Sequence, residues 1–273
     1  MKIPYYHIDA FADRPFTGNQ AAVMPLDAWL PDETLQAIGA ENNFAETAFV
    51  VEDATGAADY ELRWFTPTAE VAMCGHATLA SGHVMLTASD GTQHADRVTF
   101  RTRRAGILEV RRHKAGYELS LPVTRVERRD DANLLRALRV DGEVFHSVSG
   151  AEETAIVLVE DEATLRAIDV DMRALGAIDL MAICTARGKD HDVVSRVFVP
   201  AWGVDEDSVT GSAHAALAPF WAPRLGRGEF TAHQASERGG DLTCRLEGEG
   251  DDARVWLGGQ CVTVVEGSFY LPG

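Results

Sequence analysis

Residues 63–80 read RWFTPTAEVAMCGHATLA and combine an apolar strand, a proline turn and the start of an apolar helix. Residues 205–221, DEDSVTGSAHAALAPFW, again place a glycine at the start of an apolar helix. The pattern Arg-x-Phe-x-Pro that opens the first segment recurs 133 residues later, and Gly75 recurs as Gly211, 136 residues later. Such a repeat predicts a structural unit that occurs twice, although two similar strand-to-helix turns can also arise by chance.

The rest of the chain extends this pattern on both sides. Short apolar runs separated by turn residues predict further strands around each helix. We expect one half over residues 1–120 and a second over 130–262, with the last strand, 263–273, returning to the first half. The charged stretch 122–133, which contains ERRDD, is the candidate linker. The predicted class is α/β (α+β).

Composition excludes several classes of partner. The chain has 273 residues, 46% of them hydrophobic, with 25 Lys and Arg against 42 Asp and Glu and a net charge of −17. Nucleic acids and anionic membranes attract positive surfaces, so neither is an expected partner. No stretch resembles a secretory leader or a membrane span. The four cysteines are widely spaced and form no CxxC motif, which favours reduced thiols in the cytoplasm.

Cofactor motifs are missing from the sequence. It contains no P-loop, no GxGxxG after a predicted strand and no HExxH or other paired-histidine pattern. We therefore expect no nucleotide, flavin or metal cofactor.

The two predicted helix starts are candidate anion sites. The first amides of a helix lack internal partners and lie at its positive end. Gly75 with His76 and Gly211 with Ser212 could together hold a substrate carboxylate, because glycine allows close approach to the backbone. The alternative is that both glycines only permit tight turns. Two prolines, Pro219 and Pro223, are expected to kink or shorten the second helix.

Two carboxylates are candidates for acid–base chemistry. Glu46 lies in the apolar stretch NFAETAFVV, where poor hydration would raise its pKa toward a range useful for proton transfer. Asp207 precedes the second helix start and could act as a second acid or base, or orient a substrate amine. Each carboxylate could instead cap backbone amides or face water.

Two residues beside the first helix start are further candidates. His76 could bind substrate or move a proton, or could be a buried histidine bonded to the backbone. Cys74 could be a nucleophile or an acid, because a helix start lowers a thiol pKa, or it could be an inert buried thiol. His83 and His214 lie within the apolar helices, and we expect both to be structural.

Together these segments resemble the PhzF-like (phenazine biosynthesis) family. The matching segments are DAFADRPFTGNQAAV (9–23), ETAFV (46–50), the two segments quoted first, and QASERGG (234–240). The resemblance implies a fold like that of diaminopimelate epimerase: two pseudo-symmetric domains, each a curved, mostly antiparallel sheet around a central helix, with the active site in the cleft between them. It also implies a cofactor-independent homodimer. Gln20 and Ser208 stand where proline is common in the family.

The resemblance also implies roles for particular residues. The catalytic glutamate of the family corresponds to Glu46, and Asp207 and His76 are the other expected catalytic residues. Gly75, His76, Gly211 and Ser212 correspond to its substrate-binding positions. The best-known member isomerises trans-2,3-dihydro-3-hydroxyanthranilate, so we expect proton transfer between carbons of a small, possibly cyclic or dihydroaromatic, carboxylate.

Two other functions remain open at this level. MCGH also resembles the first half-site of proline racemase and diaminopimelate epimerase, which use two opposed cysteines. The corresponding DSVTGS segment has no cysteine, and Cys184, Cys244 and Cys261 lie elsewhere. A cysteine-based amino-acid racemase or epimerase is therefore disfavoured. A non-catalytic small-molecule binding protein is the other alternative, and the presence of Glu46, His76 and Asp207 argues against it.

Overall fold

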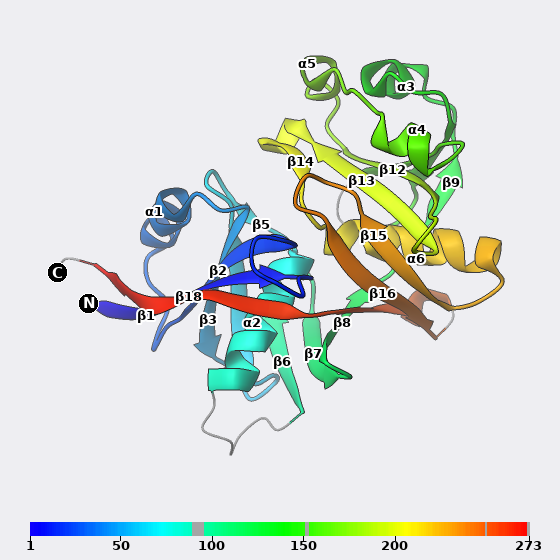
Figure 1. The fold of residues 1–273 in the computed structure, drawn as a ribbon. Coiled ribbons are helices and arrows are strands. Elements are labelled where there is room, and N and C mark those ends of the chain that lie inside the picture. Colours follow the sequence, from blue (N-terminus) through cyan, green and yellow to red (C-terminus); the bar gives the residue numbers. More distant parts are fainter. Residues whose placement is uncertain (89–95, 151–152, 249, 272–273) are drawn as a thin grey trace. The chain divides into compact units, whose positions relative to one another are not determined.

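The chain forms two compact units (Figure 1). The computed structural model describes residues 1–88, 96–150, 153–248 and 250–271. Unit 1 comprises Met1–Ser120 with Gly258–Gly273, and unit 2 comprises Leu121–Leu257. The chain therefore passes between the units twice, along strands β8 (Gly116–Pro122) and β17 (Arg254–Gly259). Within the described ranges, every helix lacks the length and apolar character needed to cross a lipid bilayer.

Unit 1 is a mixed sheet with one central helix and one outer helix. β2 and β3 are parallel and are joined through α1, as a parallel pair requires. β18 pairs with β1 from one end to the other, and residues 272–273 of the expected last strand lie outside the described residues. The elements besides β8 are β1 (Lys2–Ala10), β2 (Asn19–Pro25), α1 (Asp32–Asn42), β3 (Glu46–Glu52), β4 (Tyr60–Phe65), β5 (Glu70–Val71), α2 (Gly75–Ala88), β6 (Arg97–Thr102), β7 (Ile107–His113) and β18 (Cys261–Tyr270).

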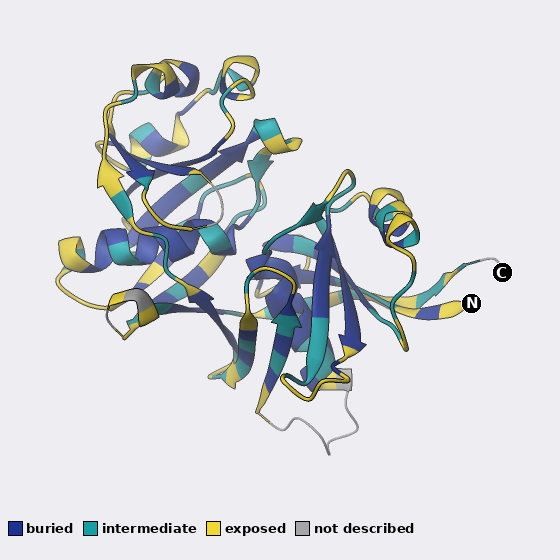
Figure 2. Cartoon of the chain, turned by 180° about the vertical axis from the view of Figure 1, so that it is seen from behind, coloured by how far each residue is buried: buried dark blue, intermediate teal, exposed yellow. Residues whose placement is uncertain are grey.

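The core of unit 1 forms around α2, which lies against β1, β2, β3, β6 and β7. Apart from His76, the first turns of α2 are apolar or small on every side, and all of them are buried, as expected for a helix enclosed by a sheet. Gly82 allows the closest approach, because a Cβ atom there would lie 2.3 Å from Cγ1 of Val110 on β7. Figure 2 shows that buried residues follow the strands.

Unit 2 has the same kind of sheet with α6 as its longest helix. Its elements besides β17 are β9 (Val126–Arg128), α3 (Ala132–Leu138), β10 (Glu143–Ser147), β11 (Thr154–Leu158), α4 (Glu162–Arg166), α5 (Met172–Leu175), β12 (Met181–Arg187), β13 (Val193–Val199), η1 (Pro200–Trp202), β14 (Val204–Asp207), α6 (Gly211–Leu225), β15 (Glu229–Gln234), β16 (Gly240–Glu247) and η2 (Gly250–Asp252).

The strands of the two units pair in the same order. In unit 1 the sequence β1-β2-β3-β4 pairs antiparallel, parallel and antiparallel. In unit 2 the sequence β10-β11-β12-β13 pairs in the same three senses. β4 then pairs with β5 and, in parallel, with β6, as β13 pairs with β14 and β15. This pseudo-symmetry confirms the predicted fold class.

One arginine bridge is also repeated at equivalent positions. Arg63 on β4 donates from Nε and Nη2 to Glu70 on β5, both at 2.8 Å. Arg196 on β13 donates from Nε at 2.8 Å and from Nη2 at 2.9 Å to Glu206 on β14. Both arginines thus make the planar, two-point contact that a carboxylate fits. The conserved spacing of Arg-x-Phe-x-Pro therefore places a cross-strand clamp in each unit.

The strand register explains why the spacing between equivalent residues of the two units grows from 133 to 136. Phe65 pairs with Glu70, and Phe198 pairs with Glu206. The β13–β14 hairpin of unit 2 contains one additional residue pair, Val199 with Val204. Its pairing register also shifts between Phe198 and Val199. These additional residues lie before the helix, so the helix starts remain equivalent.

Unit 2 corrects the expected linker and the expected shortening of the second helix. The stretch 122–133 is no simple linker, because it contains β9, which pairs with β10, and the start of α3. α6 continues to Leu225 with Pro219 and Pro223 inside it. Pro219 cannot donate to the carbonyl of Ala215, but the Thr124 amide donates to that oxygen at 3.0 Å. A tertiary hydrogen bond thus replaces the missing helical one.

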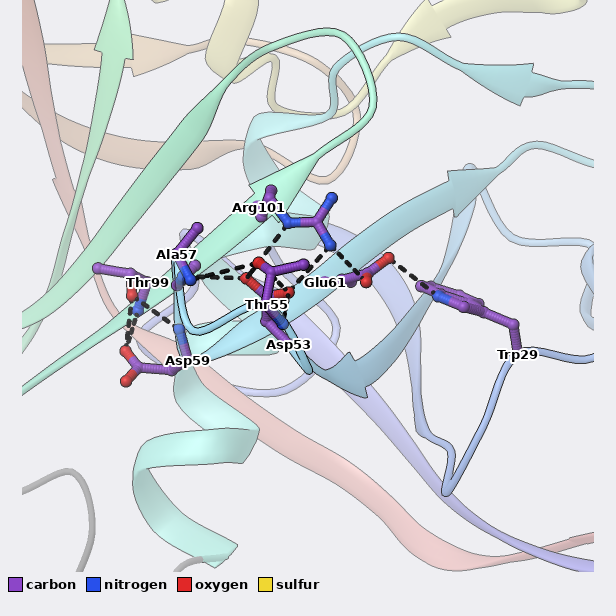
Figure 3. A network of polar contacts seen from close by, with 9 residues as sticks. Trp29, Asp53, Thr55, Ala57, Asp59, Glu61, Thr99 and Arg101 are labelled. Carbon is purple, nitrogen blue, oxygen red and sulfur yellow. Dashed lines mark hydrogen bonds and ion pairs between the residues drawn. The ribbon is translucent and has the colours of Figure 1, made fainter.

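A polar network lies at the other end of β4 in unit 1 (Figure 3). Arg101 on β6 donates to Asp53 at 2.9 Å and to Glu61 at 2.5 Å. Glu61 also accepts from Nε1 of Trp29 at 3.0 Å. Arg101 and the hydrogen bonds from Thr55 and Ala58 lower the pKa of Asp53. The network fixes the turn between β3 and β4 and is separate from the candidate site residues.

Candidate active site

Unit 1 brings Glu46 and His76 together. Glu46 is the first residue of β3, and His76 is the second residue of α2. Oε2 of Glu46 lies 3.1 Å from Nε2 of His76. The same oxygen is buried and, beyond this contact with His76, has no hydrogen-bond partner among the described residues. Buried carboxylate oxygens are normally hydrogen-bonded, so an oxygen paired with a histidine alone makes Glu46 a candidate for acid–base chemistry.

Asn19 lies on the opposite edge of the His76 ring. Its Nδ2 is 3.1 Å from Nδ1 of His76. Asn19 thus contacts the ring nitrogen that faces away from Glu46. Asn19 belongs to the turn motif RPFTGNQ, but its role was not predicted from the sequence. It is found only through its contact with His76 across 57 positions of the chain.

Burial and charge set the protonation of this cluster. Burial and the Glu46 charge raise the pKa of Cys74 to about 12, so the residue is a thiol at neutral pH. Burial alone would lower the pKa of His76, but the charges that Cys74 and Glu46 can carry raise it well above its ordinary value. Because Cys74 is neutral, the Glu46 carboxylate is the charge that acts on His76 at neutral pH. The cluster therefore suits proton transfer better than thiolate chemistry.

Unit 2 holds the second set of candidate residues. Asp207 ends β14, and its Oδ2 accepts a hydrogen bond from the Thr210 hydroxyl at 2.5 Å. Gly211 and Ser212 open α6, and the Ser212 hydroxyl lies 3.9 Å from the sulfur of Met181. Asp207, Gly211 and Ser212 thus lie along one short segment of unit 2, whereas Glu46 and His76 belong to unit 1.

Gln234 fixes this segment, although its role was not predicted from the sequence. Its side chain is fully buried, accepts from the Thr210 amide at 2.9 Å and donates to the Asp207 carbonyl at 2.7 Å. Ser236 adds a hydrogen bond to the Ser208 carbonyl at 2.7 Å. Both residues belong to the QASERGG segment. They hold the loop in shape where Ser208 replaces the more rigid proline.

The helix histidines have structural contacts, as expected. Nδ1 of His214 lies 2.8 Å from the Thr210 carbonyl, and burial lowers the pKa of His214 to about 4. His214 is therefore a neutral donor to the backbone. His83 contacts the Tyr117 hydroxyl at 2.9 Å and that of Thr263 at 2.9 Å. Burial raises the pKa of the Cys184 thiol to about 12.

Within the described residues, two side-chain groups have the spacing of a metal site. One is Glu46, Cys74 and His76, and the other is His191, His233 and Asp241. The first group contains the candidate catalytic residues Glu46 and His76. The second group lies in unit 2, outside the candidate catalytic residues.

Comparisons with known proteins identify the family of the chain. A protein of Pseudomonas aeruginosa named as an uncharacterized isomerase is 44% identical over 99% of this chain and 100% of its own length. The crystal structure of a PhzF-family phenazine biosynthesis protein from Enterococcus faecalis matches with a TM-score of 0.87 at 38% identity, covering 99% of this chain and 100% of that one.

A more distant structure shares only the fold. The hydroxyproline epimerase of Agrobacterium vitis matches with a TM-score of 0.66 at 13% identity, covering 98% of this chain and 91% of that one. The model of the phenazine biosynthesis-like proteins matches residues 8–267. With its duplicated sheets, the chain therefore belongs to the phenazine biosynthesis-like (PhzF) family of isomerases.

Proposed function

We propose that this isomerase moves a proton between two carbons of a small carboxylate substrate, with Glu46 as the general base. The main support is the buried Oε2 of Glu46, which lies 3.1 Å from Nε2 of His76 and has no other hydrogen-bond partner among the described residues. A carboxylate held only for structure would have its buried oxygen satisfied. A cyclic or dihydroaromatic substrate fits the family resemblance.

The proposed reaction is balanced without a cofactor. Glu46 removes a proton from one carbon, and the electron pair of the broken C–H bond spreads into the adjacent unsaturated system. The protonated Glu46 then returns the proton to a different carbon, which leaves the enzyme unchanged. His76 holds the Glu46 carboxylate and the substrate in place, and Asn19 orients the His76 ring. Activity should survive chelation and desalting.

The remaining expected residues have binding roles in the proposal. Asp207 orients an amine or hydroxyl group of the substrate and assists the transfer. The helix-start amides at Gly75–His76 and at Gly211–Ser212 bind its carboxylate. We also propose the homodimer that the family resemblance implies, which light scattering of the purified protein tests.

A cysteine-based racemase is the less favoured candidate. Such an enzyme needs a reactive thiolate, and the Cys74 pKa of about 12 opposes one. Cys74 directly precedes α2 in unit 1. Thr210 directly precedes α6 in unit 2, and it has no thiol.

Deuterium incorporation from heavy water tests the proposal. Dihydroaromatic and amino-acid carboxylates are incubated with the wild type, Glu46→Gln and Cys74→Ala, after circular dichroism shows that both variants are folded. We expect exchange by the wild type and by Cys74→Ala, and almost none by Glu46→Gln. An inactive Cys74→Ala beside an active Glu46→Gln would replace the glutamate mechanism with the thiol mechanism.

A further inference from the structure

A cluster of two histidines and one aspartate lies on the sheet of unit 2. His233 on β15 is directly paired with Asp241 on β16. His191 lies just before β13, whose parallel pairing with β15 begins at Val193. The three side chains therefore come from two paired strands and from the loop that enters the neighbouring strand β13, and none has a role in the proposed reaction.

The geometry of the cluster converges on one carboxylate oxygen. Oδ1 of Asp241 lies 2.6 Å from Nδ1 of His233 and 3.3 Å from Nε2 of His191. The three potential ligand atoms are all within 4.8 Å of one another. The two imidazole rings stack with centroids 5.3 Å apart and an angle of 24° between their planes.

We propose that His191, His233 and Asp241 bind a divalent transition-metal ion of the zinc type. Two imidazoles and a carboxylate are ligands that Zn²⁺ accepts, and three protein ligands leave one position for water. With metal–ligand distances of about 2.0–2.1 Å, ligand atoms in a tetrahedral site lie about 3.3 Å apart. The His191–Asp241 distance of 3.3 Å already meets this value. The Asp241 side chain is 65% exposed, so it can rotate to widen its distance from His233.

The site also has a structural consequence. A bound ion would join β15, β16 and the loop before β13 at one place. His233 is directly followed by Gln234, whose side chain holds the Thr210 amide and the Asp207 carbonyl. The ion is therefore a brace for the hairpin that carries the Gln234–Gly239 loop. It takes no part in the chemistry.

Zinc binding by the untagged, chelator-treated and desalted protein tests the site. Isothermal titration should give one Zn²⁺ per chain, and Co²⁺ should bind the same site with a visible absorption band. Loss of a supporting partner usually weakens metal binding by about 10–100-fold, so His233→Gln and Asp241→Asn should each weaken it by at least about 10-fold. Zn²⁺ should also raise the thermal midpoint of the wild type but not of these variants.

Two control variants make the test decisive. His113→Gln removes another partly exposed histidine beside a carboxylate, since Nδ1 of His113 lies 3.7 Å from Glu118, and it should leave zinc binding unchanged. Glu46→Gln removes a ligand of the other metal-like group and should also bind normally. Absence of saturable binding by the wild type would overturn the proposal. Equal binding by the His233 and Asp241 variants, or loss of binding in Glu46→Gln alone, would do the same.

Discussion

In unit 1 the first residue of β3 is Glu46, whereas in unit 2 the first residue of the equivalent strand β12 is Met181. The second helix residue is His76 in α2 and Ser212 in α6. The polar contact between Glu46 and His76 at 3.1 Å thus corresponds to a weak contact between Ser212 and Met181 at 3.9 Å. The two units place different side chains at the same positions of one framework.

The framework itself is repeated down to its side chains. Arg63 and Glu70 in unit 1 match Arg196 and Glu206 in unit 2, with the same two-point geometry. Both units therefore keep the clamp that shapes the strand-to-helix turn. Among the described residues, a buried carboxylate oxygen lies beside a histidine at that turn in unit 1 alone.

The largest expected effect is a difference in turnover between variants at Glu46 and at Met181, the first residues of β3 and β12. Glu46→Gln should lower turnover by about 10²–10⁴-fold, because it keeps the shape but removes the base. Met181→Leu, at the equivalent position, should leave turnover nearly unchanged and cost less than about 1.5 kcal/mol in stability. Steady-state rates and thermal midpoints of both variants measure the contrast. Equal losses of turnover would contradict the assignment of chemistry to unit 1.

The second effect tests the shared framework. Arg63→Met and Arg196→Met should each reduce the free energy of unfolding by about 2–3 kcal/mol. This is below the full cost of breaking a buried pair because the carboxylate partners are partly exposed. Arg103→Met, an exposed arginine, should cost less than about 1 kcal/mol. Urea unfolding gives the three values. A large cost in only one of the two clamps would show that they are not equivalent.

The third effect is a pH dependence of stability in the alkaline range that comes from His76 in unit 1. The raised pKa of His76 means that the folded protein holds this proton more tightly than the unfolded chain does. The contribution of His76 to stability is therefore complete below the ordinary pKa of 6.5 and is lost as the pH rises through the raised value.

Thermal midpoints of the wild type and His76→Gln measure this contribution across the alkaline range. We expect the difference between the two proteins to shrink as the pH rises. The same comparison in the Glu46→Gln background should show a weaker dependence, because the charge that raises the His76 pKa is gone. A difference that stays constant with pH would mean that His76 gains no proton affinity from Glu46.

The smallest effect concerns the two helices. Pro219→Ala in α6 should change the free energy of unfolding by less than about 1 kcal/mol, although a proline inside a helix usually costs about 3 kcal/mol relative to alanine. The Ala215 carbonyl already accepts from the Thr124 amide, so a new helical donor would compete for a satisfied oxygen. Urea unfolding of this variant measures the change. A gain near the full amount would show that the Thr124 contact contributes little.

Much of the architecture follows from local sequence. The Arg-x-Phe-x-Pro and Gly-started helix patterns predicted a duplicated fold, because strand period and helix apolarity are properties of neighbouring residues. Glu46, His76, Asp207, Gly211 and Ser212 were identified by motif. Each of Glu46 and His76 lies in a sequence motif that can be recognised locally. Their contact, however, depends on the tertiary fold.

The tertiary structure alone decided what surrounds these residues. Asn19 meets the His76 ring across 57 positions, and Gln234 reaches the Thr210 amide across 24. No local period encodes such pairs, because they arise when distant strands are placed beside a helix start. The continuation of α6 through Pro219 likewise depends on a donor from Thr124. The sequence thus determined which segments form and which residue types they present. The three-dimensional fold determined which polar atoms find partners, and it left one buried oxygen of Glu46 with His76 alone beside it among the described polar groups.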